Sequence, residues 1–200
     1  MKSLYYSEQA MEHIARRVLT AFDASLYTGT PRAVPIEEII EANGLSLEYQ
    51  YLRKNGRILG KTIFDDGLEA VYDMEKKEYA LFPVKAGTIL IDASLCAEDA
   101  GTGRLRFTCA HELAHWVLHK RLYAGTGESA ALAPALGENA MEIQANMLGS
   151  ALLMPMSQVK RCFYRLHAGR DRQMLITEMA VVFQVSRQAM RIRLEQHHLL

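Results

Sequence analysis

Residues 107–119 read FTCAHELAHWVLH, and residues 138–155 read ENAMEIQANMLGSALLMP. The first stretch contains His111-Glu112-Leu113-Ala114-His115, which is the pattern H-E-x-x-H. In a helix, side chains four residues apart lie on one face, so both imidazoles can reach one metal ion. The intervening Glu112 then lies beside the metal, where it can take a proton from a water molecule. The pattern therefore predicts a helix with a catalytic metal site, and zinc is the expected ion.

Two exposed histidines on a helix without a metal would give the same pattern. The flanking residues favour the metal interpretation, because apolar side chains recur at helical spacing around the motif. These are Leu105, Phe107, Leu113, Val117 and Leu118, with Trp116 on one flank. A catalytic zinc ion is expected to have three protein ligands and a water molecule whose pKa is lowered towards ~7. One ligand is therefore still to be found.

The third ligand is expected on the next helix, where Glu138 and Glu142 lie four residues apart. Acidic residues near the start of a helix often only complement its dipole, which suits Glu138. Glu142 lies one turn further in and shares its face with small residues that would let the two helices approach closely. We therefore prefer Glu142. The segment 124–138, rich in Gly and Ala, is either a loop that flanks the site or a plain connector, and the sequence leaves both open.

Three further residues are candidates for auxiliary roles, because hydrolysis of a carbonyl compound at a zinc ion needs a donor that stabilises an oxyanion. His119 lies four residues after His115 and either lines the cleft or caps the end of the helix. We favour the structural role for His119. Tyr123 and Tyr164 are weaker candidates for the same donor. Cys109 is expected to be a core thiol.

The composition limits the class of protein. The chain has 200 residues, a formal net charge of zero and 3 cysteines without a CxxC pair. A neutral chain gives no sign of nucleic acid or anionic membrane as a partner, and three scattered cysteines suggest reduced thiols. The first residues lack the apolar stretch of a secretory signal, and no apolar run approaches the ~18 residues of a membrane span. We expect a cytoplasmic protein that does not enter the membrane.

The pattern outside the motif predicts an α+β fold. Ser7 is expected to cap a first helix, and Pro35 to begin a second one that ends near Gly44. Five short strands are then predicted at residues 45–51, 58–64, 68–72, 79–84 and 88–92. Tight turns between them indicate a mainly antiparallel sheet. An extended peptide could add as a strand to the edge of such a sheet beside the metal helix.

The segment after Pro155 is predicted to be helical, with Ser157 and Ser186 as caps. Residues 156–200 contain 8 Lys and Arg and 3 Asp and Glu, and the last two helices have the layout of a helix-turn-helix. Either Arg187, Arg191 and Arg193 contact DNA phosphates, or these helices pack on the core. We favour packing, because no strongly basic run is present. The terminal His197 and His198 are expected to be frayed.

The segments TCAHELAHWVLH and EIQANMLGSALLMP resemble the ImmA/IrrE family of metallopeptidases. Members typically carry a HELGH-like helix that ends in Leu-His, then a helix of the form E-x-x-A-N that ends in Leu-Leu-Met-Pro. The resemblance is strong over residues 104–155, and it implies that Glu142 is the third zinc ligand and Glu112 the catalytic acid and base. Ala114 stands where the family often has Gly, which is a minor departure.

The resemblance further implies a zincin-like core of helices on a small sheet at 1–155, and a C-terminal helical region packed on it at 156–200. It also implies a cytoplasmic zinc endopeptidase whose protein substrate is a helix-turn-helix repressor, cut in response to a stress or as a switch of a mobile element. The alternative is a regulator without proteolytic activity, which binds a repressor or DNA through the same scaffold. The presence of Glu112 favours the enzyme, because a binding role does not need this residue.

Overall fold

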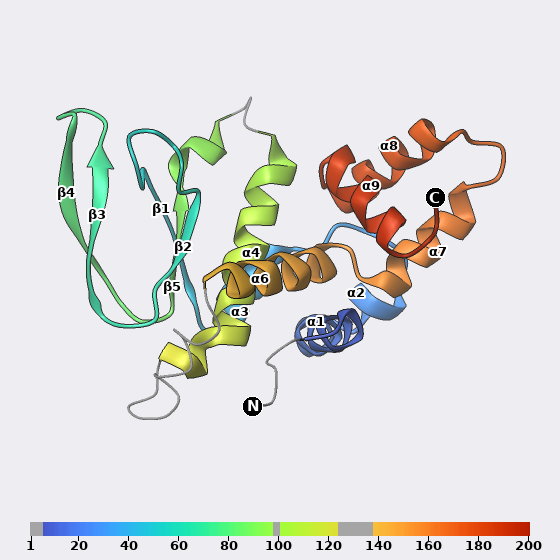
Figure 1. Cartoon of the computed structure of the whole chain (residues 1–200), viewed down its shortest axis with the longest axis horizontal. Helices are drawn as coiled ribbons and strands as arrows, with labels where there is room; N and C mark the ends of the chain where they lie inside the picture. The colour runs from blue at the N-terminus through green and yellow to red at the C-terminus, as the bar shows by residue number, and fades with distance from the viewer. Residues whose placement is uncertain (1–5, 98–100, 124–137) are drawn as a thin grey trace.

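The computed structural model describes residues 6–97, 101–123 and 138–200. Two small sheets lie at one side of the molecule and the C-terminal helices at the other, with helices α4 and α6 between them (Figure 1). The predicted α+β class is confirmed. None of the described helices combines the length and apolar character that crossing a bilayer would require. The sequence left open whether segment 124–138 flanks the site or only connects two helices, and residues 124–137 lie outside the described residues.

The N-terminal part is helical and supports the later helices. It comprises α1 (Glu8–Phe22), α2 (Ser25–Thr28) and α3 (Ile36–Ala42). Ser7 caps α1 as predicted, since its hydroxyl accepts a hydrogen bond from the Ala10 N–H at 3.2 Å. Pro35 precedes α3 as predicted, and the apolar faces of both helices are buried in the main core.

Five strands form at the predicted places. They are β1 (Ser46–Gln50), β2 (Gly60–Thr62), β3 (Gly67–Asp73), β4 (Glu78–Val84) and β5 (Thr88–Asp92). Two of the three strand pairings are antiparallel, but the strands divide into a three-stranded sheet of order β1-β5-β2 and the hairpin β3-β4. β1 runs parallel to β5, because a long crossover rather than a tight turn connects them. Every residue of β5 is buried, as expected for a central strand.

The two motif stretches form long helices that pack on each other. A short 3-10 helix, η1 (Ala93–Cys96), leads from β5 towards α4 (Thr102–Tyr123), and α6 (Glu138–Leu153) follows. A Cβ atom added to Gly149 would lie 3.2 Å from the His111 main-chain nitrogen. The predicted close approach of the two helices through small residues is therefore confirmed. Cys109 is buried, as predicted.

The C-terminal region is helical and shares the main core. It comprises α7 (Met156–Leu166), α8 (Arg172–Phe183) and α9 (Arg187–Gln196). Ser186 caps α9 as predicted, but the prediction for Ser157 was wrong. Pro155 occupies the N-cap of α7, and the Ser157 hydroxyl instead donates to the Tyr27 carbonyl at 3.3 Å. Tertiary contact with α2 therefore replaces local capping.

Buried arginines connect this region to the earlier helices. Arg106 of α4 donates to the carbonyls of Val34 and Gln184. Arg193 of α9 donates to the Met154 carbonyl and forms an ion pair with Glu12 of α1. Arg193 is only 5% exposed, so it is not available to DNA phosphates. The expectation that His197 is frayed was wrong, because this residue is buried.

Candidate metal centre

Two imidazole rings of α4 and one carboxylate of α6 converge on a single point. The Nε2 atoms of His111 and His115 lie 3.0 Å apart. Each also lies 3.2 Å from an oxygen of Glu142. One potential ligand atom from each of the three residues lies within 4.8 Å of the other two. The structure thus brings together the three residues that the sequence suggested as metal ligands.

Neighbouring side chains orient both imidazoles. The Asn146 Oδ1 atom lies 3.1 Å from His111 Nδ1, so the amide oxygen accepts the Nδ1 proton. His115 Nδ1 lies 3.1 Å from His119 Nδ1, and His119 Nε2 lies 3.1 Å from Gln144 Oε1. One set of tautomers satisfies all three contacts: His115 donates to His119, and His119 donates to Gln144. Both Nε2 lone pairs then point towards Glu142, as metal binding requires.

Electrostatics favour the neutral form of His115. Burial is the main cause that lowers the pKa of His115 to about 3, and the neighbouring His111 and His119 lower it further. A neutral imidazole keeps the lone pair that a metal ligand needs. The side chain is therefore ready to bind a cation across the ordinary pH range.

The auxiliary candidates have three different positions. His119 is 1% exposed and lies behind His115, where burial lowers its pKa. Tyr123 lines the cavity beside the three converging residues, and its ring stacks on Phe64 at 4.3 Å between centroids. Tyr164 lies on α7, is 62% exposed and is not among the residues that line this cavity. Of the three, only Tyr123 faces the space in front of the histidines.

Glu112 is buried beside this centre. The Thr62 hydroxyl lies 2.7 Å from Glu112 Oε2 and 2.8 Å from the Glu112 carbonyl oxygen, so it donates to one of them. Burial is the main cause that raises the pKa of Glu112 to about 7, and the charge of Glu142 adds to it, while the bond from Thr62 opposes the shift. The carboxyl can therefore both accept and release a proton near neutral pH.

The raised pKa of Glu112 predicts a pH-dependent gain in stability when this residue is changed to Gln. The folded-state pKa of about 7 exceeds the ordinary value of 4.5, so folding favours the protonated carboxyl. The protonated carboxyl makes its full contribution to the free energy of unfolding below pH 4.5, and this contribution is lost as the pH rises through about 7. Above that pH, metal-free Glu112→Gln is expected to be more stable than the metal-free parent by about 3 kcal/mol. Urea unfolding at pH 4 and pH 8 measures the difference, and equal differences at both values would contradict it.

The converging residues open into a cavity of about 550 Å³. β2 forms one wall and α4 the other, with Gly60 and Thr62 facing Glu112. A Cβ atom on Gly60 would lie 2.6 Å from Glu112 Oε1, so any larger residue at this position would overlap with the carboxylate where it now lies. β2 is an edge strand, and none of the described strands pairs with its outer side. An extended chain therefore has both space and an open sheet edge beside the histidines.

A family profile described as the IrrE N-terminal-like domain, of the peptidase family M78, matches residues 74–195. The match covers α4 and α6 together with the C-terminal helices. The chain belongs to the IrrE N-terminal-like peptidase family. Individual curated proteins give no match to the chain. The membership agrees with the resemblance drawn from the two motifs, and it makes this IrrE-like chain a member of a metallopeptidase family.

Sequence reasoning missed several residues of this IrrE-like site. Thr62 and Gly60 lie about fifty positions before Glu112, and no local pattern joins them to it. Asn146 offered a signal, since it lies four residues after Glu142 and therefore on the same helical face. Gln144 is 6% exposed, and burial of a polar residue appears only once the fold is known.

Proposed function

We propose that this protein is a zinc-dependent endopeptidase that hydrolyses a peptide bond in a protein substrate. The observation that carries the proposal is the convergence of His111, His115 and Glu142 beside the buried carboxyl of Glu112. Two imidazole nitrogens and one carboxylate oxygen are a donor set that suits a catalytic zinc ion, and these three residues would hold it. The acceptors Asn146 and His119 hold the rings of His111 and His115 in the tautomer that zinc needs.

In the proposed reaction Glu112 carries out the proton transfers and Thr62 orients its carboxylate. When bound, zinc would polarise the scissile carbonyl and lower the pKa of the attacking water. Glu112 accepts a proton from that water and later gives it to the nitrogen of the leaving amine. The Thr62 hydroxyl fixes the direction of the carboxylate during these transfers. Tyr123 lines the same cavity as His111 and His115, so its hydroxyl is the candidate that would donate a hydrogen bond to the oxyanion.

A protein substrate is proposed to bind along β2. A peptide in extended form would add to the outer side of this strand and place its scissile bond in front of the histidines. Main-chain hydrogen bonds would supply affinity, and the aromatic rings of Phe64 and Tyr123 would contact the side chains. The open edge of β2 supports an endopeptidase, because chain can continue on both sides of the cut bond.

We propose a helix-turn-helix repressor as the substrate, cut in the cytoplasm in response to a stress or as a switch of a mobile element. The support is family membership. The test is to incubate the zinc-loaded protein with any helix-turn-helix repressor that is encoded beside its gene and to follow the products by mass spectrometry. One defined cut that is absent with Glu112→Gln is expected. An uncut repressor, together with cleavage of an unrelated unfolded protein, would refute the substrate and keep the peptidase.

Regulation without proteolysis, through repressor or DNA binding, is the competing function, and the C-terminal region bears on it. We propose that residues 1–155 form the peptidase domain and that 156–200 pack on it as a helical support. Arg193 is buried, and Arg191 pairs with Glu195 at 2.9 Å, which leaves a weak basic surface for DNA. Salt-dependent binding of the full chain to duplex DNA in a mobility-shift titration would favour the competing function.

Gly60→Ala is expected to lower the rate of cleavage by about 10²-fold, because the added methyl group displaces the carboxylate of Glu112 from its place. Zinc content should not change, since Gly60 does not contact the proposed ligands. Gly67→Ala is the matched control, because a Cβ atom there meets no atom within 4 Å. Steady-state kinetics on a quenched peptide substrate measures both variants, and equal rates would contradict the steric argument.

Asn146→Ala is expected to weaken zinc binding by about 10- to 100-fold, because His111 loses the acceptor that fixes its tautomer. Competition with a fluorescent chelator measures the change. Asn139→Ala, on the same helix and exposed, is the matched control. Unchanged affinity in Asn146→Ala would show that the ring of His111 is held by packing alone.

A further inference from the structure

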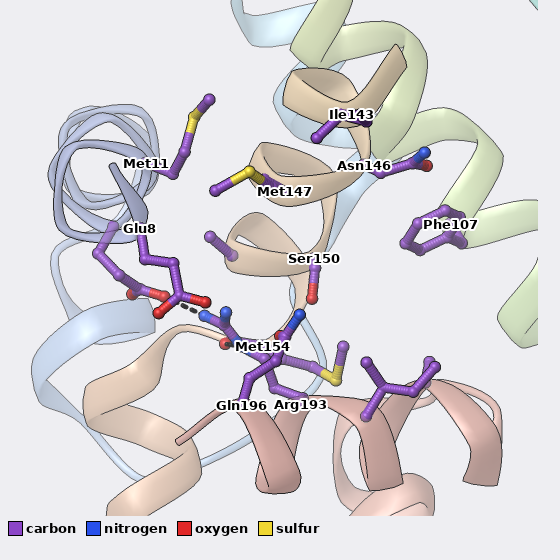
Figure 2. A pocket seen from close by; sticks show the side chains of 14 residues that line it. Glu8, Met11, Phe107, Ile143, Asn146, Met147, Ser150, Met154, Arg193 and Gln196 are labelled. Carbon is purple, nitrogen blue, oxygen red and sulfur yellow. Dashed lines mark hydrogen bonds and ion pairs between the residues drawn. The ribbon is translucent and has the colours of Figure 1, made fainter. Parts of the chain in front are cut away.

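A second cavity of about 330 Å³ lies between α1, α6 and α9, apart from the proposed peptidase site (Figure 2). It brings together the beginning, the middle and the end of the chain. Phe107 lines this cavity and also the one in front of the histidines, so the two cavities share one residue of their walls. The volume is at the lower end of the range for sites that bind small molecules.

The wall of the second cavity is mainly apolar and rich in methionine. Met11 of α1, Met147 of α6 and Met154, which directly follows α6, line it together. Ile143 of α6 and Ile192 of α9 line it as well and are each 46% exposed, which leaves apolar surface open to an entering molecule. Methionine side chains adapt to the shape of what they contact. The cavity therefore suits an apolar body, such as an aromatic ring with a short alkyl chain.

The polar groups of this cavity carry an excess of negative charge. Arg193 is already paired with Glu12 and also donates to the Met154 carbonyl at 3.0 Å. Glu8 lies four residues before Glu12, on the same face of α1, and adds a second carboxylate to the lining. Among the described residues, no cation forms an ion pair with Glu8. The cavity therefore has two carboxylates and one guanidinium, which leaves one negative charge without a counter-charge. A cationic group on the ligand would neutralise that charge.

The cavity also touches the support of the metal centre. Asn146 lines it, and the Oδ1 atom of the same side chain accepts the hydrogen bond from His111. Figure 2 shows Asn146 and Phe107 next to each other at the end of the cavity that faces α4. A molecule held in this cavity would contact the residue that orients a proposed zinc ligand.

We propose that this cavity is an effector site for a small amine: an apolar body packs on the methionines, and its ammonium group pairs with Glu8. Such a ligand contacts Asn146 and so changes the surroundings of His111. The site is independent of the peptide-binding cavity, and binding to it does not require that the protein be a peptidase.

The test uses three probes with one body and different head groups: 4-phenylbutylamine, 4-phenylbutanol and 4-phenylbutyrate. Calorimetric titration of the full chain is expected to show the amine binding about tenfold more tightly than the carboxylate, with the alcohol between them. In Glu8→Gln this preference should disappear, whereas Glu41→Gln, an exposed carboxylate on α3, should keep it. Three probes that bind alike, or none that binds at about 1 mM, would overturn the proposal.

The location is tested by filling the cavity and by observing His111. Ala189→Phe and Ile143→Trp place a ring in the cavity from α9 and α6, and each is expected to abolish amine binding while circular dichroism stays unchanged. In the parent, the imidazole resonances of His111 should shift on adding the amine, and those of His167, the C-cap residue of α7, should not. Amine binding that survives in both filled variants, or leaves His111 unaffected, would overturn the assignment.

Discussion

Glu112→Gln is expected to lower the rate of peptide cleavage by about 10³-fold and to leave zinc binding intact. Glutamine keeps the size of the side chain and can still contact the Thr62 hydroxyl, so the local packing is preserved. It cannot accept a proton from water, and proton transfer to the leaving amine is lost with it. Single-turnover assays on a quenched peptide measure the rate, and metal analysis of the same sample measures the zinc content.

The burial of Glu112 makes this prediction stronger than the motif alone would. Glu112 is only 6% exposed, and in the metal-free protein burial raises the pKa of its carboxyl to about 7, which is typical of a group that exchanges protons rather than one that serves only as a surface charge. A glutamate that served only to hold the helix would tolerate Gln without loss of rate. Glu112→Asp keeps the charge but withdraws it by one methylene, so it should recover only a small part of the activity. Normal cleavage by Glu112→Gln would refute the proposed mechanism, even if zinc were bound.

Local patterns were enough to predict the longer helices and the five strands of this protein, but not the short helices α2 and η1. The spacing of His111 and His115, the cap at Ser7 and the cap at Ser186 depend on residues within one or two turns, and each is visible in the sequence. The alternation of apolar residues likewise gave the places of all five strands. What it could not give was their pairing, because the parallel contact of β1 with β5 depends on a crossover of about forty residues.

Interactions between segments that are distant in the sequence explain what the sequence predictions left open, missed or had wrong. The sequence left two roles open for Arg193, DNA contact and packing on the core, and the favoured packing is the one found, because Glu12, near the start of the chain, supplies its counter-charge. Ser157 has the sequence of a helix cap, but the carbonyl of Tyr27 takes its hydroxyl. Thr62 and Gly60 shape the surroundings of Glu112 from another strand. Each depends on a partner that no local pattern reveals.

Glu142→Ala is expected to weaken zinc binding by more than about 100-fold, since it removes a proposed ligand rather than a residue that supports one. Its carboxylate oxygens lie 3.2 Å from the Nε2 atoms of both His111 and His115, so no other described carboxylate has the same position. The side chain is exposed, which means that its loss should cost the metal-free fold little. Chelator competition measures the affinity, and thermal unfolding of the metal-free protein measures the fold.

Glu138→Ala is the matched control, because Glu138 is the first residue of α6 and lies four positions before Glu142. Both substitutions remove one negative charge from the same helix, so a general electrostatic effect would weaken zinc binding in both. A ligand effect appears only in Glu142→Ala. If Glu138→Ala lost the metal and Glu142→Ala kept it, the third ligand would have to be reassigned to the start of the helix. If both kept it, two histidines and water would suffice to hold zinc, and the convergence of Glu142 on them would need another explanation.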